Sequence, residues 1–302
     1  MTKVVSVSEA VKKFVNDGSA IVFGGFTQNR HPMSFIREMI RQGKRDLVVY
    51  GHSLGIDLDI LIGAGAVKRV EMAYVGDELF VTPSPNFRKA VEDGKIEFED
   101  YSNYGATLRF LAGALGIPFM PTKTMLGSDM LKKNYEEEKK KCHVMECPFT
   151  GEKVVLLPAA KPDLAIIHVQ TVGENGTARI YGQRFADDII AKAAEKVVVT
   201  TEEVVPEEQI RQEPELNCLP FFEVNAIIKS PYGAHPTSCY GRYDYDPDHY
   251  KTYVKAVKSN SFDEYLERYA YVDEREYLER IGGIEKMKKL KADPFLGYSL
   301  NL

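Results

Sequence analysis

The chain has 302 residues, of which 44% are hydrophobic and 27% are charged, and its formal net charge is −5. This is the composition of an ordinary globular protein, long enough for one large domain or two small ones. The negative balance argues against a nucleic-acid partner, and no apolar run approaches the roughly 20 residues that a membrane span requires. Residues 1–18 alternate apolar and charged side chains. This pattern predicts a first helix instead of a signal peptide, and hence a cytoplasmic protein without membrane association.

Strand-like and helix-like segments alternate along the rest of the chain. An apolar run at 20–25 precedes a predicted helix that starts at Pro32 and ends before Gly43. A second helix is expected at 84–94. The repeated order of strand, turn and helix, with β-branched strands, predicts an α/β protein with a largely parallel sheet and flanking helices. The segments with strand-like composition are 46–53, 69–78, 95–102, 153–158, 163–172, 195–205 and 222–231.

Two segments depart from this alternation. Residues 127–152 are charged and irregular, and they are interpreted as an excursion inserted between the two halves of the sheet. From Asp244 onwards the chain is rich in tyrosine and charge, with apolar residues at helical spacing. We therefore expect an α/β domain at 1–243 and a C-terminal helical extension at 244–302. Exposed tyrosines on such an extension would suit a subunit interface.

The four cysteines raise the question of a metal site. Cys142, His143 and Cys147 are close in sequence, which invites a zinc interpretation. Their spacing is not that of a Cys-x-x-Cys knuckle, and no second pair of ligands lies nearby. We therefore predict free thiols and no metal.

Residues 24–30, Gly-Gly-Phe-Thr-Gln-Asn-Arg, form an unusual end to the first predicted strand. Adjacent glycines indicate a positive φ or the close approach of another group. The third glycine of a dinucleotide loop and the Gly-Lys-Ser/Thr of a P-loop are both missing. Residues 51–57 and 75–80 end two further strands in a similar way, and ligands of open α/β sheets bind beyond the carboxyl ends of the strands. The polar residues predicted to share a site there are Thr27, Asn29, Arg30, His52, Ser53, Asp77 and Glu78.

These loops contain no evident self-sufficient nucleophile. Residues 51–55, Gly-His-Ser-Leu-Gly, have the spacing of a Gly-x-Ser-x-Gly elbow, but we predict no nucleophile elbow there, and no cysteine pairs with an evident histidine. His52 and Ser53 are sequence neighbours whose side chains point in different directions, so they do not by themselves form a dyad. Carboxylate chemistry and a site completed by another chain remain as the alternatives.

Seven stretches of the sequence resemble the A (alpha) subunit of the class I coenzyme A transferases, most closely the glutaconate CoA-transferase branch. The resemblance implies the α/β subunit fold of that family and a homologous B subunit as partner. It also implies a CoA thioester as substrate, with a dicarboxylic or otherwise polar acyl group, and no permanently bound cofactor. The stretches follow one another in order and cover 24–32, 57–70, 87–102, 116–121, 162–182, 197–205 and 230–246.

The resemblance also implies roles for the first loop. In this family the loop lies at the mouth of an active site between the A and B subunits, where a B-subunit glutamate attacks the thioester. Backbone N–H groups stabilise the oxyanion. Gly24, Gly25 and Phe26 would then close over the acyl group, and Thr27, Asn29 and Arg30 would lie near the substrate or the facing subunit. Arg30 would pair with a substrate carboxylate or form a salt bridge across the interface.

Asp77 and Glu78 depart from the small polar residues of the family pattern. An acidic group there would raise the pKa of the B-subunit glutamate, repel a carboxylate substrate or activate water. Glu78 could instead form a salt bridge. Two alternatives to CoA transfer therefore stand: a CoA-thioester hydrolase or C–C lyase that uses Glu78, and a non-catalytic scaffold subunit.

Two further motifs have structural interpretations. Asn175 and Gly176 are typical of a type I′ hairpin turn. His235 and Cys239 match the family pattern, and we interpret their segment as a packed connector.

Overall fold

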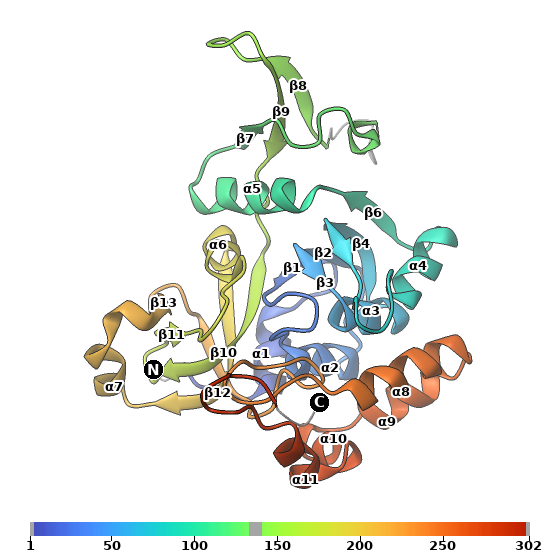
Figure 1. The fold of residues 1–302 in the computed structure, drawn as a ribbon, viewed down its shortest axis with the longest axis vertical. Helices are drawn as coiled ribbons and strands as arrows, with labels where there is room; N and C mark the ends of the chain where they lie inside the picture. Colours follow the sequence, from blue (N-terminus) through green and yellow to red (C-terminus); the bar gives the residue numbers. More distant parts are fainter. Residues whose placement is uncertain (1–2, 133–140, 300–302) are drawn as a thin grey trace.

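The computed structural model describes residues 3–132 and 141–299. Within these residues a nine-stranded sheet forms the centre of the molecule (Figure 1). Seven of its strands lie parallel to their neighbours, so the predicted α/β fold with a largely parallel sheet is confirmed. In spatial order these strands are β14 (Ala226–Lys229), β12 (Lys196–Val205), β10 (Leu164–Gly173), β1 (Ala20–Phe23), β2 (Leu47–Tyr50), β4 (Val67–Met72) and β6 (Glu97–Asp100).

A hairpin extends this sheet beside the carboxyl-terminal half of β10. Strands β11 (Ala178–Arg179) and β13 (Asn217–Leu219) pair antiparallel there. The predicted type I′ turn is wrong, because that turn requires a positive φ at both central residues and only Gly176 of the predicted pair has one, at 114°. The Gly176 amide closes the turn by donating to the Gly173 carbonyl at 2.8 Å.

Helices cover both faces of the sheet. Side chains of a strand alternate between the faces, so Ile21 and Phe23 pack in one hydrophobic cluster while Val22 packs in another. The second cluster includes Phe110 and Ile190 from helices α5 (Asn103–Ala114) and α6 (Asp187–Ala193). The helices on the first face are α1 (Val7–Phe14), α2 (Met33–Arg41), α3 (Ile56–Gly63) and α4 (Pro85–Glu92).

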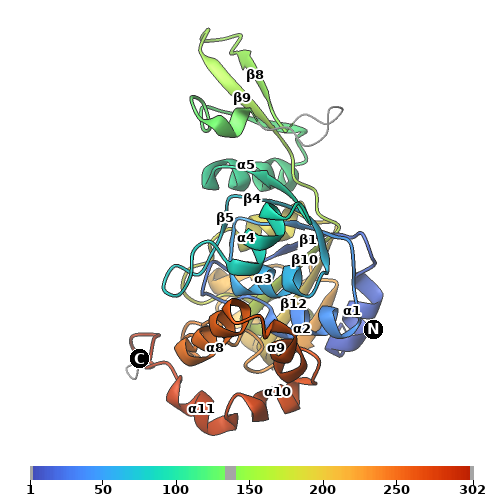
Figure 2. The ribbon, with the colours of Figure 1, turned by 90° about the vertical axis from the view of Figure 1, so that its right-hand side faces the viewer.

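A small antiparallel sheet projects from the body beyond α5 (Figures 1 and 2). It consists of β7 (Phe119–Thr122), β9 (Lys153–Pro158) and β8 (His143–Glu146). The prediction of an irregular segment at 127–152 is therefore wrong for β8 and for the short 3₁₀ helix η1 (Asp129–Leu131). All four β8 residues are exposed, so the strand carries no alternation of apolar and polar residues that could reveal it.

The C-terminal helices form a third layer outside α2 and α3 (Figure 2). They are α8 (Pro247–Lys258), α9 (Phe262–Tyr269), α10 (Glu274–Arg280) and α11 (Gly283–Lys289). The expectation that their tyrosines are exposed is wrong for most of them. The helical spacing places these rings on the helix faces that pack against the body of the protein. The tyrosines buried in the same cluster as α1–α4 are Tyr250, Tyr253, Tyr265, Tyr269 and Tyr277.

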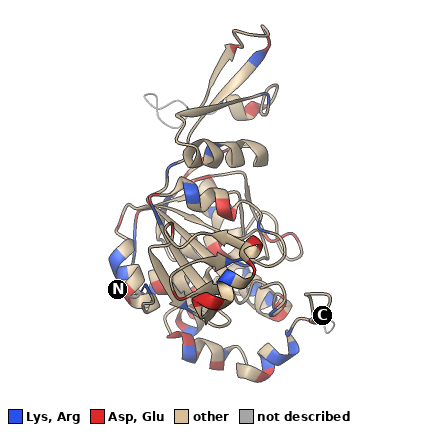
Figure 3. Ribbon diagram, turned by 90° about the vertical axis from the view of Figure 1, so that its left-hand side faces the viewer, with Lys and Arg blue, Asp and Glu red and all other residues tan. Residues whose placement is uncertain are grey.

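The remaining elements are short. They are β3 (Ser53–Leu54) and β5 (Tyr74–Val75), which pair in parallel, α7 (Glu207–Gln212) and the 3₁₀ helix η2 (Pro214–Leu216). Acidic and basic residues alternate over the outer helices (Figure 3). Among residues 3–132 and 141–299, no helix combines the length and hydropathy needed to cross a bilayer.

Candidate functional site

Three loops meet at the carboxyl edge of the parallel strands. They are the glycine loop (24–30), the histidine loop (51–57) and the acidic loop (75–80). The Thr27 amide donates to the Ser53 carbonyl at 3.1 Å, which joins the first two. The Gln28 side-chain amide donates to the Glu78 carboxylate at 3.3 Å, which joins the first and third. The structure therefore brings together the loops that the sequence placed in one site.

Both glycines of the glycine loop are required by contacts within the chain. A Cβ on Gly24 would lie 2.8 Å from the Ile167 side chain and 3.0 Å from the Asp187 carboxylate. Gly25 has a φ of +96°, and a Cβ there would lie 2.4 Å from the Asn29 carbonyl oxygen. The double glycine thus allows the loop to fold tightly on itself and on the sheet.

The amides at the start of this loop are already hydrogen-bonded. The Gly25 amide donates to Asp187 Oδ1 at 2.9 Å, and the Phe26 amide donates to the Asn29 carbonyl at 2.9 Å. The Asn29 side chain in turn accepts from the Ser238 hydroxyl at 3.0 Å. In this arrangement the Gly25 and Phe26 amides stabilise the loop conformation, and their hydrogens are not available to a ligand.

Arg30 is held inside the chain. Its side chain is 3% exposed, and its φ is 58°. Nη1 donates to Asp187 Oδ2 at 2.5 Å and to the His168 carbonyl at 2.9 Å, and Nη2 donates to the Gln183 carbonyl at 3.2 Å. Its charge partner therefore belongs to the same chain, which differs from both pairings considered from the sequence.

An aromatic contact covers the middle of the glycine loop. The Phe26 ring stacks on Phe185 at 4.8 Å and is tilted against His52 at 5.5 Å. Burial lowers the pKa of His52, which keeps the ring neutral near pH 7. The Ser53 hydroxyl points elsewhere and donates to Asn103 at 3.1 Å, so His52 and Ser53 form no dyad.

His31 contacts two carbonyl groups of the glycine loop, and it was not predicted as a site residue from the sequence. Its Nε2 lies 2.9 Å from the Thr27 carbonyl oxygen, and its Nδ1 lies 3.0 Å from the Gly24 carbonyl oxygen. Nδ1 is also 3.0 Å from the Asp57 carboxylate. The His31 ring therefore links the two ends of the segment 24–27 and lies next to a carboxylate of the histidine loop.

The two residues of the acidic pair have opposite environments. Asp77 is fully buried, and burial raises its pKa well above the usual range, with further increases from the charges of Asp57 and Asp59. Glu78 is exposed at the rim beside Gln28. Of the pair, Glu78 is the carboxylate that can meet a substrate or a second subunit.

A buried network of hydrogen bonds lies next to the glycine loop, where Arg30 donates to the His168 carbonyl. The ligand atoms of His168, Glu202 and Cys239 lie within 4.8 Å of one another. His168 is bonded to the Thr200 hydroxyl at 2.8 Å and to Glu202 at 2.9 Å, and Tyr243 donates to Glu202 at 2.7 Å. Burial raises the pKa of the Cys239 thiol well above its usual range, so it is a poor nucleophile and metal ligand. The hydrogen bonds to Glu202 explain why these polar side chains lie close together in the interior.

The other residues singled out in the sequence lie away from the loops or inside the protein. His235 is buried, with its ring nitrogens 2.7 Å from the Tyr277 hydroxyl and 3.1 Å from Asp246, which agrees with a packed connector. Cys142 and Cys147 flank β8 in the projecting sheet.

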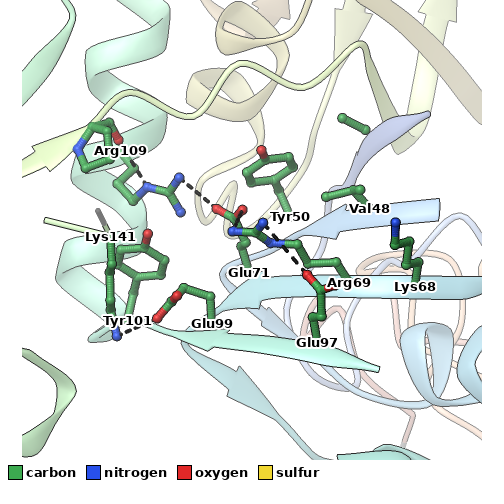
Figure 4. Close-up of a pocket in the computed structure, with 12 residues that line it drawn as sticks. Val48, Tyr50, Lys68, Arg69, Glu71, Glu97, Glu99, Tyr101, Arg109 and Lys141 are labelled. Carbon is green, nitrogen blue, oxygen red and sulfur yellow. Dashed lines mark hydrogen bonds and ion pairs between the residues drawn. The ribbon is translucent and has the colours of Figure 1, made fainter. Parts of the chain in front are cut away.

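A polar cavity of about 540 Å³ lies on the sheet face beneath α5 (Figure 4). Most of its charges are paired: Arg109 and Arg69 contact Glu71 at 2.8 and 2.9 Å, and Lys141 contacts Glu99 at 3.0 Å. None of its lining residues belongs to the three loops. The cavity is therefore separate from the candidate site and offers little uncompensated charge to a ligand.

Comparison with known proteins gives consistent similarities over the whole chain. The family model for "Coenzyme A transferase" matches residues 4–230. The A subunit of glutaconate CoA-transferase from Acidaminococcus fermentans is 38% identical over 316 residues, which cover 100% of this chain and 98% of that protein. The A subunit of 3-oxoadipate CoA-transferase from Pseudomonas knackmussii is 31% identical over 274 residues, covering 89% and 94%. The crystal structure of the A. fermentans glutaconate CoA-transferase matches with a TM-score of 0.94 and 38% identity over 99% of this chain and 98% of that chain.

Proposed function

The chain belongs to the coenzyme A transferase family, and we propose that it is the A subunit of a two-subunit enzyme that moves CoA between carboxylic acids. The observation that carries this proposal is the likeness to the A subunit of glutaconate CoA-transferase, which extends over the whole chain in both sequence and structure. Relatives named for glutaconate and 3-oxoadipate support a dicarboxylic or otherwise polar acyl group in the substrate.

A glutamate of the partner B subunit supplies the nucleophile in this proposal. Its carboxylate attacks the thioester carbonyl, which forms an acyl-glutamyl anhydride and releases the CoA thiolate. The thiolate then attacks the glutamyl carbonyl, which gives a glutamyl-CoA thioester and frees the first acid. A second carboxylate repeats these steps in reverse and leaves as the new acyl-CoA.

This chain contributes one wall of the site. The glycine loop is fixed by Asp187 and His31, so it presents the Phe26 ring in a defined position. Glu78 stands at the rim, where it is exposed in the free chain. A rigid wall favours catalysis because the substrate is oriented without reorganisation of the loop.

Glu78→Gln in the assembled complex tests the reaction type. If Glu78 only lines the site, we expect a modest loss of transfer activity, and hydroxylamine or borohydride still traps a thioester on the partner subunit. If Glu78 is a general base, the rate falls by on the order of 10²–10⁴. Glu146→Gln, at an exposed position in the projecting sheet, is the matched control.

The outcomes separate the three candidate functions. A strong loss without any trappable intermediate would replace the transferase by a thioester hydrolase or C–C lyase. A scaffold role for this chain predicts that neither Glu78→Gln nor Phe26→Ala changes turnover or the Michaelis constant of the acyl-CoA.

A further inference from the structure

We propose that a groove along α8 binds the phosphorylated adenosine end of the CoA substrate; this inference rests on the proposed function. The groove has a volume of about 450 Å³. Phe80 and Val254 form its apolar part, and three lysines and Ser259 complete it. We call it the lysine groove, and its lysines are Lys251, Lys255 and Lys258.

The lysines of the groove carry charge that the chain leaves uncompensated. Their spacing places them on one face of the helix, and all three are exposed. Within residues 3–132 and 141–299 no carboxylate forms an ion pair with any of them, whereas Lys286 of α11 pairs with Asp248 at 2.8 Å. Three free cations around one groove, in a chain with a net charge of −5, indicate an anionic ligand.

The groove begins next to the candidate site. Phe80 belongs to the acidic loop and is two residues from Glu78. Its ring stacks on Tyr250 of α8 at 4.5 Å, which fixes the loop to the helix. The helix has 12 residues and so extends about 18 Å along its axis. The lysine groove therefore leads from Phe80, near the rim of the site, along α8, whose place in the fold Figure 2 shows.

Coenzyme A matches this arrangement chemically. Its thioester and its phosphates lie at opposite ends of a long pantetheine arm, so the phosphates must bind at a distance from the reacting carbonyl. A 3′-phosphate and a 5′-diphosphate suit three ammonium groups, because lysine recognises phosphate as a point charge. The apolar surface of Phe80 and Val254 suits the adenine ring. The cavity beneath α5 lacks this match because Arg69, Arg109 and Lys141 are paired with carboxylates, which leaves Lys68 as its one cation without an ion pair among the described residues.

Equilibrium binding to the assembled complex tests the inference. The variant is Lys251→Ala/Lys255→Ala/Lys258→Ala, and Lys12→Ala/Lys153→Ala/Lys161→Ala is a control that removes the same charge elsewhere. The ligands are CoA, 3′-dephospho-CoA and pantetheine. We expect the groove variant to bind CoA roughly tenfold more weakly or worse, 3′-dephospho-CoA to be affected less, and pantetheine to bind as in the native complex. Added salt should weaken CoA binding to the native complex more than to the variant, since exposed charges are screened.

Each result has a defined meaning. Unchanged CoA affinity in the groove variant, or an equal loss in the control, would overturn the inference. An equal loss for CoA and pantetheine would overturn it too, because the lysines would then act on the whole fold. Failure of the proposed function is a different result: the native complex would bind CoA but transfer no acyl group.

Discussion

At the residue scale, Asp187 organises the candidate site. It accepts the Gly25 amide at 2.9 Å and pairs with Arg30 at 2.5 Å, and both charged side chains are almost fully buried. It also occupies the space that a side chain on Gly24 would need. A single carboxylate thus contributes several of the contacts that fix the loop conformation, although it lies 157 residues from Arg30 in sequence.

Asp187→Asn tests this role. The amide keeps the shape but leaves the Arg30 guanidinium buried without a counter-charge, and breaking a buried pair costs about 3–5 kcal/mol. We expect the free energy of unfolding in urea to fall by about this amount. Asp188→Asn, at the neighbouring half-buried position, should change it by less than about 0.5 kcal/mol. Equal stability of the Asp187 variant and the native chain would show that Arg30 does not depend on this carboxylate.

At the element scale, a buried carboxylate joins three helices. Asp59 of α3 accepts hydrogen bonds from the amides of Asn86 and Phe87 at the start of α4, at 3.2 and 2.6 Å. It also accepts the hydroxyl hydrogen of Tyr253 from α8. The C-terminal helices are therefore attached to the core by polar as well as apolar contacts. Burial raises the pKa of Asp59 to about 6, although these hydrogen bonds act in the opposite direction.

The raised pKa makes stability depend on pH in a defined direction. Between about pH 4 and pH 6 the folded state holds a proton on Asp59 that the unfolded state releases, so the contribution of Asp59 to stability falls as pH rises. A shift of about two pKa units corresponds to on the order of 3 kcal/mol. The measurement is urea unfolding of the native chain and of Asp59→Asn at pH 4 and pH 7. We expect the native chain to lose stability relative to Asp59→Asn on going to pH 7. Asp93→Asn, at an exposed position, keeps Asp59, so its stability should follow that of the native chain at both pH values.

At the scale of the whole molecule, patterns in the sequence predicted the sheet and the meeting of the three loops. Short apolar runs such as Ile21, Val22 and Phe23, followed by polar loops, carry that information locally. The family resemblance is confirmed by the comparisons. The partner of Arg30 and the burial of Tyr250 depend on contacts between distant segments, which one sequence without aligned relatives does not reveal.

The whole-molecule prediction is that the chain alone does not catalyse transfer. Arg30 is paired within the chain, the thiol of Cys239 is buried outside the three loops, and Glu78 is left as an exposed carboxylate beside Leu79, which is 64% exposed. An exposed leucine next to the site suits coverage by a second subunit. We expect the purified chain to show no transfer between acyl-CoA and a carboxylate, and activity to appear on titration with the B subunit up to a fixed ratio. Size-exclusion chromatography of the same mixtures should show complex formation in parallel, and robust turnover by the chain alone would contradict the two-subunit site.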